Sequence, residues 1–136
     1  DQTKESVILS LLTEDGTEGT RSGLNWGQRP GRNPNQAYIP VPKKVRDKEF
    51  FPPIGQHFII LTDDGKHLDC VIAQQFGKAI HTYKDNSILG SYFRERMGVA
   101  SGKYVTLTDY SKYGRSDVTI YKIDDETYYL DFSVKK

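Results

Sequence analysis

The 136-residue sequence has little of what several common classes of protein require. Its single cysteine, Cys70, excludes a disulfide framework and a paired-cysteine metal site. It has no apolar run of about 18 residues that could span a bilayer, and no basic and apolar leader at its start. We expect a soluble, intracellular protein in which Cys70 is a small buried hydrophobe. Because the chain opens on Asp1, we also expect a fragment of a longer polypeptide.

Catalytic signatures are missing as well. The three histidines, at positions 57, 67 and 81, are too scattered for a metal cluster, and we expect them on the surface or in strand pairing. No serine or cysteine has the sequence context of a nucleophile, and no glycine-rich stretch matches a phosphate-binding fingerprint. The sequence therefore predicts no catalytic residue, no metal and no cofactor.

Acidic residues are absent between positions 20 and 46. That stretch holds six basic residues: Arg21, Arg29, Arg32, Lys43, Lys44 and Arg46. The segment from Asp117 to Asp131 holds five acids and one lysine, so the net charge of +1 conceals a basic pole and an acidic pole. Such a distribution favours a polyanion held at one face, since the acidic pole repels phosphate.

Strand patterns dominate a chain whose length suits a single domain over residues 1–136. We expect strands at residues 6–13, 37–41, 57–62, 67–73, 78–83, 103–107, 117–123 and 127–133. Asp64-Gly65 between two apolar runs predicts a hairpin, which residues 78–83 extend into a three-stranded meander. The predicted fold class is mainly β: an open or partly closed barrel (pseudobarrel) of about seven strands, with one or two short helices at the barrel ends.

One helix is predicted over residues 86–97, where Asn86 can cap the start and Gly98 ends it. Its predicted apolar face comprises Ile88, Leu89, Tyr92, Phe93 and Met97. Its predicted solvated face comprises Arg94, Glu95 and Arg96. We expect this helix to close one mouth of the barrel.

Two other segments complete the expected fold. A single helical turn is predicted at residues 108–113 and ends at Gly114. Residues 43–55 are expected to be irregular, with Phe50 and Phe51 closing one end of the core.

A polar loop, SGLNWGQRPGRNPNQAY at residues 22–38, carries arginine, asparagine, glutamine and one tryptophan but no acid. Arginine can fork onto guanine, asparagine and glutamine can pair with adenine, and all three can hold phosphates. The candidate DNA-binding residues here are Arg21, Asn25, Trp26, Gln28, Arg29, Arg32, Asn33, Asn35 and Gln36. The alternative is a solvated loop stiffened by Pro30 and Pro34, with Trp26 folded back onto the barrel.

A second polar turn can oppose the first. Its candidate residues are Gln74, Gln75 and Lys78, at a junction between two strands. Further candidates for phosphate contacts are Lys103, Tyr113 and Arg115.

Two other functions remain open. Asp64 and Lys66 have the acid-x-Lys spacing of many metal-dependent nucleases, although Asp64-Gly65 is better explained as the tip of a hairpin. A protein-interaction barrel whose Trp26 loop docks a partner chain is the other alternative. Salt dependence separates this alternative from DNA binding, because phosphate contacts weaken as ionic strength rises.

Three longer strings, RSGLNWGQRPGRNPNQAYIPVP, FFPPIGQHFIILTDDGK and YGRSDVTIYKIDDETYYLDFS, resemble the C-terminal domain of the NgoAVII-type restriction endonucleases. The likeness covers nearly the whole chain from Thr20 onward. It implies a pseudobarrel of the plant B-three class, shared with the DNA-recognition domains of the BfiI and EcoRII restriction enzymes. In that family two arms grip the major groove, and they would fall here on Arg21 to Gln36 and on Gln74 to Lys78.

The resemblance also implies a function: sequence-specific recognition of double-stranded DNA in a bacterial, cytoplasmic type II restriction endonuclease. Because arginine favours guanine, we expect a short target that contains G·C pairs. The family's catalytic domain resembles phospholipase D and uses His-x-Lys motifs without a metal, and this chain has no such motif. We expect it to bind without cleaving, as a monomer when isolated and as part of a dimeric parent enzyme. Its expected partners are DNA and the parent's catalytic domain, with no membrane.

Overall fold

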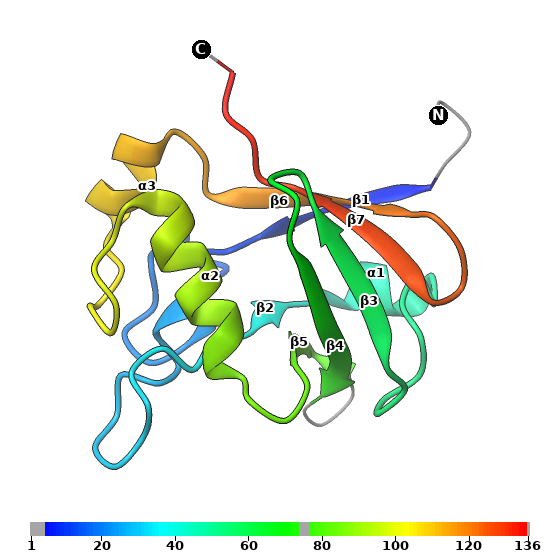
Figure 1. Ribbon diagram of the computed structural model, residues 1–136, viewed down its shortest axis with the longest axis horizontal. Coiled ribbons are helices and arrows are strands. Elements are labelled where there is room, and N and C mark those ends of the chain that lie inside the picture. The colour runs from blue at the N-terminus through cyan, green and yellow to red at the C-terminus, as the bar shows by residue number, and fades with distance from the viewer. Residues whose placement is uncertain (1–4, 74–76, 136) are drawn as a thin grey trace.

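Seven strands in the described part of the chain form one sheet that curls into a nearly closed barrel (Figure 1). The computed structural model describes residues 5–73 and 77–135. The strands are β1 (Ser6–Ser10), β2 (Ile39–Pro40), β3 (Phe58–Thr62), β4 (His67–Ala73), β5 (Ala79–Thr82), β6 (Asp117–Lys122) and β7 (Thr127–Asp131). Their order is β1-β6-β7-β3-β4-β5-β2, which leaves one unsealed seam between the edge strands β1 and β2. The predicted mainly β pseudobarrel is confirmed.

Neighbouring strands run antiparallel, except for β3 and β7, which are parallel with Ile59 opposite Thr127. Strands β3, β4 and β5 pair in chain order, so the predicted meander is confirmed. Gly65 at the tip of the β3–β4 hairpin has a φ of 86°, a conformation that glycine adopts without strain. The Asp64-Gly65 signal therefore located this turn correctly.

The core lies inside the barrel because the strands alternate between buried and solvent-facing residues. Leu9 of β1 and Ile120 of β6 are fully buried there. At one end, Phe50 and Phe51 pack on Tyr128 with ring centroids 5.6 and 5.2 Å from it. The Tyr128 hydroxyl also donates a hydrogen bond to the Phe50 carbonyl (2.8 Å). The predicted closure of the core by these two phenylalanines is confirmed.

Helix α2 (Ser87–Met97) lies against one side of the barrel (Figure 1). Asn86 occupies the N-cap position without a capping hydrogen bond, and the Asp85 carboxylate accepts the Ser87 backbone N–H instead (3.0 Å). Gly98, with a φ of 73°, ends the helix as predicted. The predicted apolar face is wrong at Ile88, whose exposure is 48%.

The predicted strand at residues 103–107 is wrong. The backbone of Val105 forms its hydrogen bonds with the Asn25 side chain rather than with another strand. Helix α3 (Leu107–Tyr113) follows, and a capping box between Thr106 and Asp109 begins it. The predicted helical turn before Gly114 is thus a longer helix.

Residues 43–55, predicted to be irregular, contain helix α1 (Lys43–Asp47). Only Val45 of this helix is buried, so no apolar periodicity marked it. Nowhere in residues 5–73 and 77–135 is a helix long and apolar enough to cross a membrane.

Candidate DNA-binding site

The first arm, residues 21–36, projects from the barrel between β1 and β2 and begins with the short 3-10 helix η1 (Gly23–Asn25) (Figure 1). The Asn25 amide donates to the carbonyls of Gly19 and Val105 (both 2.9 Å), and its oxygen accepts the Val105 N–H (2.8 Å). Asn25 is fully buried. Its side chain therefore anchors the base of the arm to a segment 80 residues away in the sequence.

Two more of the predicted site residues brace the arm against the turn at Ser101 and Gly102. The Gln28 amide donates to the carbonyls of Pro34 (2.9 Å) and Gly102 (3.2 Å). The Asn35 amide donates to the Ser101 hydroxyl (2.9 Å), and its oxygen accepts the Gly102 N–H (2.8 Å). These contacts fix the conformation of the arm and hold it to the Ser101–Gly102 turn.

Helix α2 supports the arm through a buried arginine that the sequence placed wrongly on a solvated face. Arg94 is 1% exposed and donates to the carbonyls of Lys103 (2.8 Å), Leu24 (3.0 Å) and Gly90 (3.3 Å). A Cβ on Gly90 would lie 1.8 Å from the Asn35 carbonyl oxygen, so α2 and the arm can approach only because residue 90 is glycine. The local sequence carries no signal for either role, because the Leu24 and Asn35 carbonyls are distant in the chain.

The exposed tip of the arm carries a cluster of arginines around one tryptophan. The guanidinium carbon of Arg32 lies 4.2 Å from the centroid of the Trp26 ring, and that of Arg29 lies 5.6 Å away. Arg29 also donates to the Arg21 carbonyl (2.9 Å). All three arginines are exposed, whereas Trp26 is half-buried. The cluster presents the cations of Arg29 and Arg32 to solvent, and the tryptophan ring limits the motion of the Arg32 guanidinium.

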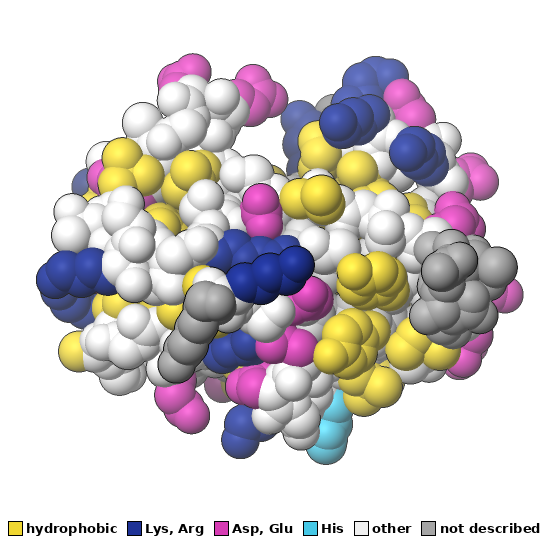
Figure 2. All heavy atoms as spheres, turned by 90° about the horizontal axis from the view of Figure 1, so that it is seen from above, with side chains coloured by type: hydrophobic (Ala, Val, Ile, Leu, Met, Phe, Trp, Pro, Cys, Tyr) yellow, Lys and Arg dark blue, Asp and Glu magenta, His cyan; other side chains and the backbone are white. Residues whose placement is uncertain are grey.

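The tip of the arm is positively charged because residues 20–46 include no acid. Glu18, the nearest acid before the arm, is engaged elsewhere: it accepts the Tyr104 hydroxyl (2.8 Å) and the Leu107 N–H (3.2 Å). By contrast, the face that carries the chain ends mixes acidic, basic and apolar side chains (Figure 2). The arm therefore differs from that face in having cations and no acids among its own residues.

The second predicted arm, residues 74–78, is described in part. Gln74 and Gln75 lie outside the described residues. Lys78 is exposed, and its carbonyl accepts the Val41 N–H (2.8 Å) next to the β2–β5 pairing. Strand β2 follows the first arm in the chain and pairs with β5, which follows the second arm. The two predicted arms therefore adjoin the same edge of the barrel.

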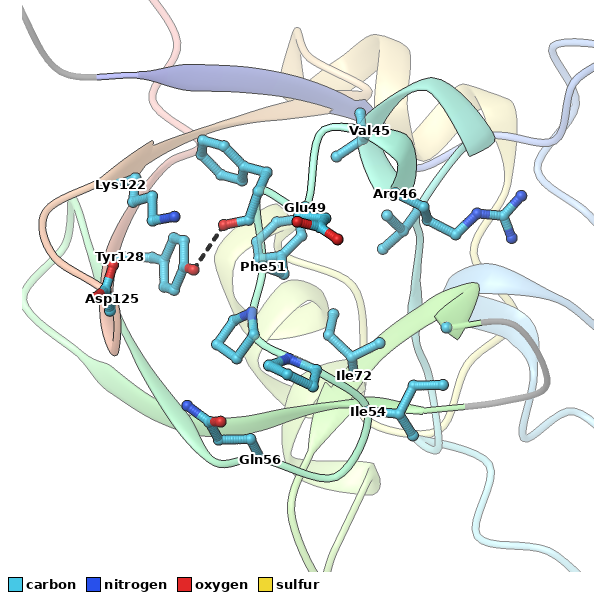
Figure 3. Close-up of a pocket in the computed structure, with 15 residues that line it drawn as sticks. Val45, Arg46, Glu49, Phe51, Ile54, Gln56, Ile72, Lys122, Asp125 and Tyr128 are labelled. Atoms are coloured by element: carbon cyan, nitrogen blue, oxygen red, sulfur yellow. Dashed lines mark hydrogen bonds between the residues drawn. The ribbon is translucent and has the colours of Figure 1, made fainter.

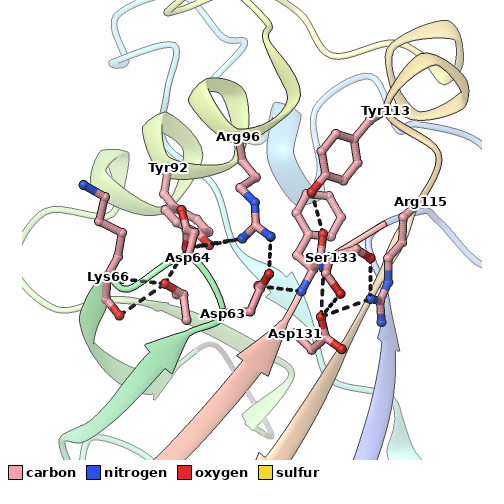
Figure 4. Close-up of polar contacts among 11 residues, drawn as sticks. Asp63, Asp64, Lys66, Tyr92, Arg96, Tyr113, Arg115, Asp131 and Ser133 are labelled. Carbon is pink, nitrogen blue, oxygen red and sulfur yellow. Dashed lines mark hydrogen bonds and ion pairs between the residues drawn. The ribbon is translucent and has the colours of Figure 1, made fainter. Parts of the chain in front are cut away.

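The other predicted residues divide into one exposed and two half-buried side chains. Lys103 is exposed. The Tyr113 hydroxyl donates to the Phe132 carbonyl, and Arg115 lies 3.5 Å from the Asp131 carboxylate (Figure 4). Arg115 also pairs with Asp117 (2.9 Å). These contacts place Tyr113 and Arg115 in the packing of the C-terminal strands, away from the arginine cluster of the first arm.

The alternative site at Asp64 and Lys66 lies at the tip of the β3–β4 hairpin (Figure 4). Asp64 accepts the Tyr92 hydroxyl (2.7 Å) and lies 3.3 Å from a guanidinium nitrogen of Arg96. Arg96 also pairs with Asp63, so it is not on a solvated face as predicted. Both carboxylates therefore tie the hairpin to α2.

The protonation of Asp64 agrees with this structural role. Partial burial acts to raise the pKa of its carboxyl group, but hydrogen bonds from Thr62 and Tyr92 and the charge of Arg96 outweigh it and lower that pKa. Within the described residues, no three His, Cys, Asp or Glu side chains come together in a way that could hold a metal ion.

Cys70, His57 and His81 also have structural roles. Cys70 is fully buried, as predicted, and burial raises the pKa of its thiol. His57 lies 3.3 Å from the Asp69 carboxylate on the neighbouring strand, and His81 contacts the Thr82 carbonyl (3.0 Å).

A barrel with a cationic, internally braced arm has the features of a nucleic-acid-binding domain, and comparison with protein families gives the class: a B3-like DNA-binding domain. The model of the NgoFVII C-terminal B3-like DNA-binding domain matches residues 1–124. The chain belongs to this family of restriction-enzyme DNA-binding domains. The predicted resemblance is confirmed, and DNA is the class of partner that the family defines.

Among solved structures, the chain is similar to that of a hypothetical Arabidopsis thaliana protein. The two are 13% identical, with a TM-score of 0.44 over 96% of this chain and 90% of that one. No curated protein matches the sequence.

Proposed function

We propose that this domain recognises a short sequence in double-stranded DNA from the major groove, with the first arm and the second arm on either side of the groove. The observation that carries the proposal is the cluster of Arg32, Arg29 and Trp26 at the exposed tip of a braced, acid-free arm. A stacked guanidinium loses less freedom on binding, and its fork matches the O6 and N7 atoms of guanine. We therefore assign Arg32 to a guanine and expect G·C pairs in the target.

Exposure and internal contacts divide the candidate residues into two groups. We assign contacts with bases or phosphates to the exposed group, to half-buried Gln36 and to the two glutamines of the second arm: Arg21, Arg29, Arg32, Asn33, Gln36, Gln74, Gln75, Lys78 and Lys103. We assign positioning of the arm to residues whose side chains hold it to itself or to the rest of the fold: Asn25, Trp26, Gln28 and Asn35. Asn33 shares this role through its side-chain oxygen, which accepts the Asn35 N–H (2.9 Å). Tyr113 and Arg115 stabilise the C-terminal strands in this account.

We further propose that cleavage belongs to a separate phospholipase-D-like domain of a bacterial, cytoplasmic restriction endonuclease. Membership of a DNA-binding family supports this division, as do the ion pairs that occupy Asp63 and Asp64. The isolated domain is then a monomer that binds DNA, and the parent enzyme is a dimer.

A binding selection tests the proposal. The domain is incubated with a randomised duplex library at about physiological ionic strength, and the recovered duplexes are sequenced. We expect one short enriched motif that contains G·C pairs, and binding that weakens steeply with salt. Salt-sensitive binding without a motif would mean that the domain binds DNA without sequence specificity. The absence of binding would mean that the arm contacts a protein partner instead. Either result would contradict the proposal.

A further inference from the structure

Helix α1 follows the first arm in the chain and adjoins the end of the second arm. Only residues 37–42 separate the first arm from the helix, and they include strand β2. Val41, just before the helix, donates its N–H to the carbonyl of Lys78 at the end of the second arm. The acid-free stretch that begins in the first arm continues into α1 as far as Arg46. Chain connectivity and one hydrogen bond therefore join α1 to the proposed DNA-binding edge.

The exposed lysines of α1 do not belong to the side that packs on the barrel. Val45, Arg46 and Glu49 line a cavity of about 480 Å³ that Phe51 and Tyr128 also line (Figure 3). Lys43 pairs with Asp47 (2.7 Å) at the surface. Lys44 of α1 and Lys48, the residue that caps the C-terminal end of α1, are both exposed and lie about one turn apart.

We propose that Lys44 and Lys48 bind phosphates of the duplex beside the second arm, as a third contact that neither arm supplies. This inference rests on the proposed function, because it needs a duplex held along the β2–β5 edge. Lysine is a flexible point charge, so it suits a phosphate rather than the edge of one base. The contact contributes affinity without sequence information.

The test compares the double variant Lys44→Ala/Lys48→Ala with wild type and with a control, Lys135→Ala. Lys135 is an exposed lysine near the chain end on another part of the surface. Affinity is measured over a range of KCl concentrations, once with the selected duplex and once with a random one. We expect the slope of log affinity against log salt to fall by about 0.9 for each lysine removed, by the same amount on both duplexes. The control should keep the wild-type slope.

Neutralising one phosphate at a time shows which positions of the duplex the two lysines contact. Selected duplexes with a single methylphosphonate at successive positions should include one or two that weaken wild type but leave the double variant unchanged. The proposal is overturned if the double variant keeps the wild-type slope, or if Lys135→Ala lowers it equally. If the wild-type domain selects no motif, the proposed function is wrong, and the inference that rests on it is wrong as well. Thermal unfolding of all variants checks that these exposed positions leave the fold intact.

Discussion

The guanidinium of Arg32 stacks on the ring of Trp26, with the guanidinium carbon 4.2 Å from the ring centroid. Trp26 is also the chain's one tryptophan. The contact links a half-buried ring to an exposed cation, and it gives the arm's tip a defined shape before DNA arrives. Preorganisation of this kind increases affinity by reducing the entropy lost on binding.

Replacing Trp26 tests the stack. Trp26→Phe keeps an aromatic face, so it should retain most of the wild-type preference for the selected duplex over a random one. Trp26→Leu should lose a large part of that preference, and combining it with Arg32→Ala should cost little more than Arg32→Ala alone. Binding measured by anisotropy of a labelled duplex gives these values. Additive losses in the double variant would show that Trp26 acts independently of Arg32.

Asn25 should matter for stability more than for base contact. Asn25→Ala leaves buried backbone groups of Val105 and Gly19 without their partner, and we expect it to cost about 2 to 4 kcal/mol of the free energy of unfolding. Arg21→Ala, at an exposed position of the same arm, should change that free energy by no more than about 0.5 kcal/mol. Urea unfolding measures both. Equal effects of the two variants would contradict the anchoring role.

Gly90→Ala should disturb the arm from outside it. Alanine favours a helix over glycine by about 1 kcal/mol, so the change would stabilise α2 if space allowed. The added Cβ would instead lie 1.8 Å from the Asn35 carbonyl oxygen and force α2 and the arm apart. We expect lower stability and weaker DNA binding, measured by urea unfolding and anisotropy. Ser91→Ala, at an exposed position of the same helix, is the control, and the account is wrong if the two variants behave alike.

The lowered pKa of Asp64 predicts a dependence of stability on pH. The pKa of the Asp64 carboxyl is lower in the folded state than its unfolded value of about 3.9. The ionised group therefore stabilises the fold fully above about pH 3.9, and this stabilisation is lost as pH falls through the folded-state pKa. The difference in free energy of unfolding between wild type and Asp64→Asn should therefore shrink on acidification below about pH 4. Asp15→Asn, at an exposed turn, serves as the comparison. A difference that is constant from neutral to acidic pH would refute the coupling to Tyr92 and Arg96.

Local signals in the sequence were enough for much of the barrel. The Asp64-Gly65 turn, the alternation in β3 to β5 and the glycine that ends α2 each depend on near neighbours in the chain. A long-range contact explains one wrong prediction, and a missing local pattern explains another. Residues 103–105 have the pattern of a strand, but the Asn25 side chain takes the hydrogen bonds that a ladder would use. Helix α1 buries only Val45 and so has no apolar stripe to recognise.

The candidate site was predictable by residue type but not by role. Composition located the arm, because a run of arginines and amides without acids is visible in the sequence. It could not separate buried Asn25 and Asn35 from exposed Asn33, since the same side chain suits a base edge and a backbone carbonyl. Arg94 was assigned to solvent for the same reason: its three carbonyl partners are brought together only by the folded chain.

Base reading by Arg32 can be measured as the ratio of affinities for the selected and random duplexes in wild type, Arg32→Ala and Lys103→Ala. A bidentate contact to one base is worth about 1 to 3 kcal/mol of discrimination, so Arg32→Ala should lower this ratio roughly 5- to 150-fold. Lys103→Ala, at a proposed phosphate contact, should weaken binding to both duplexes equally and leave the ratio unchanged. An equal loss on both duplexes for Arg32→Ala would contradict base reading by the first arm.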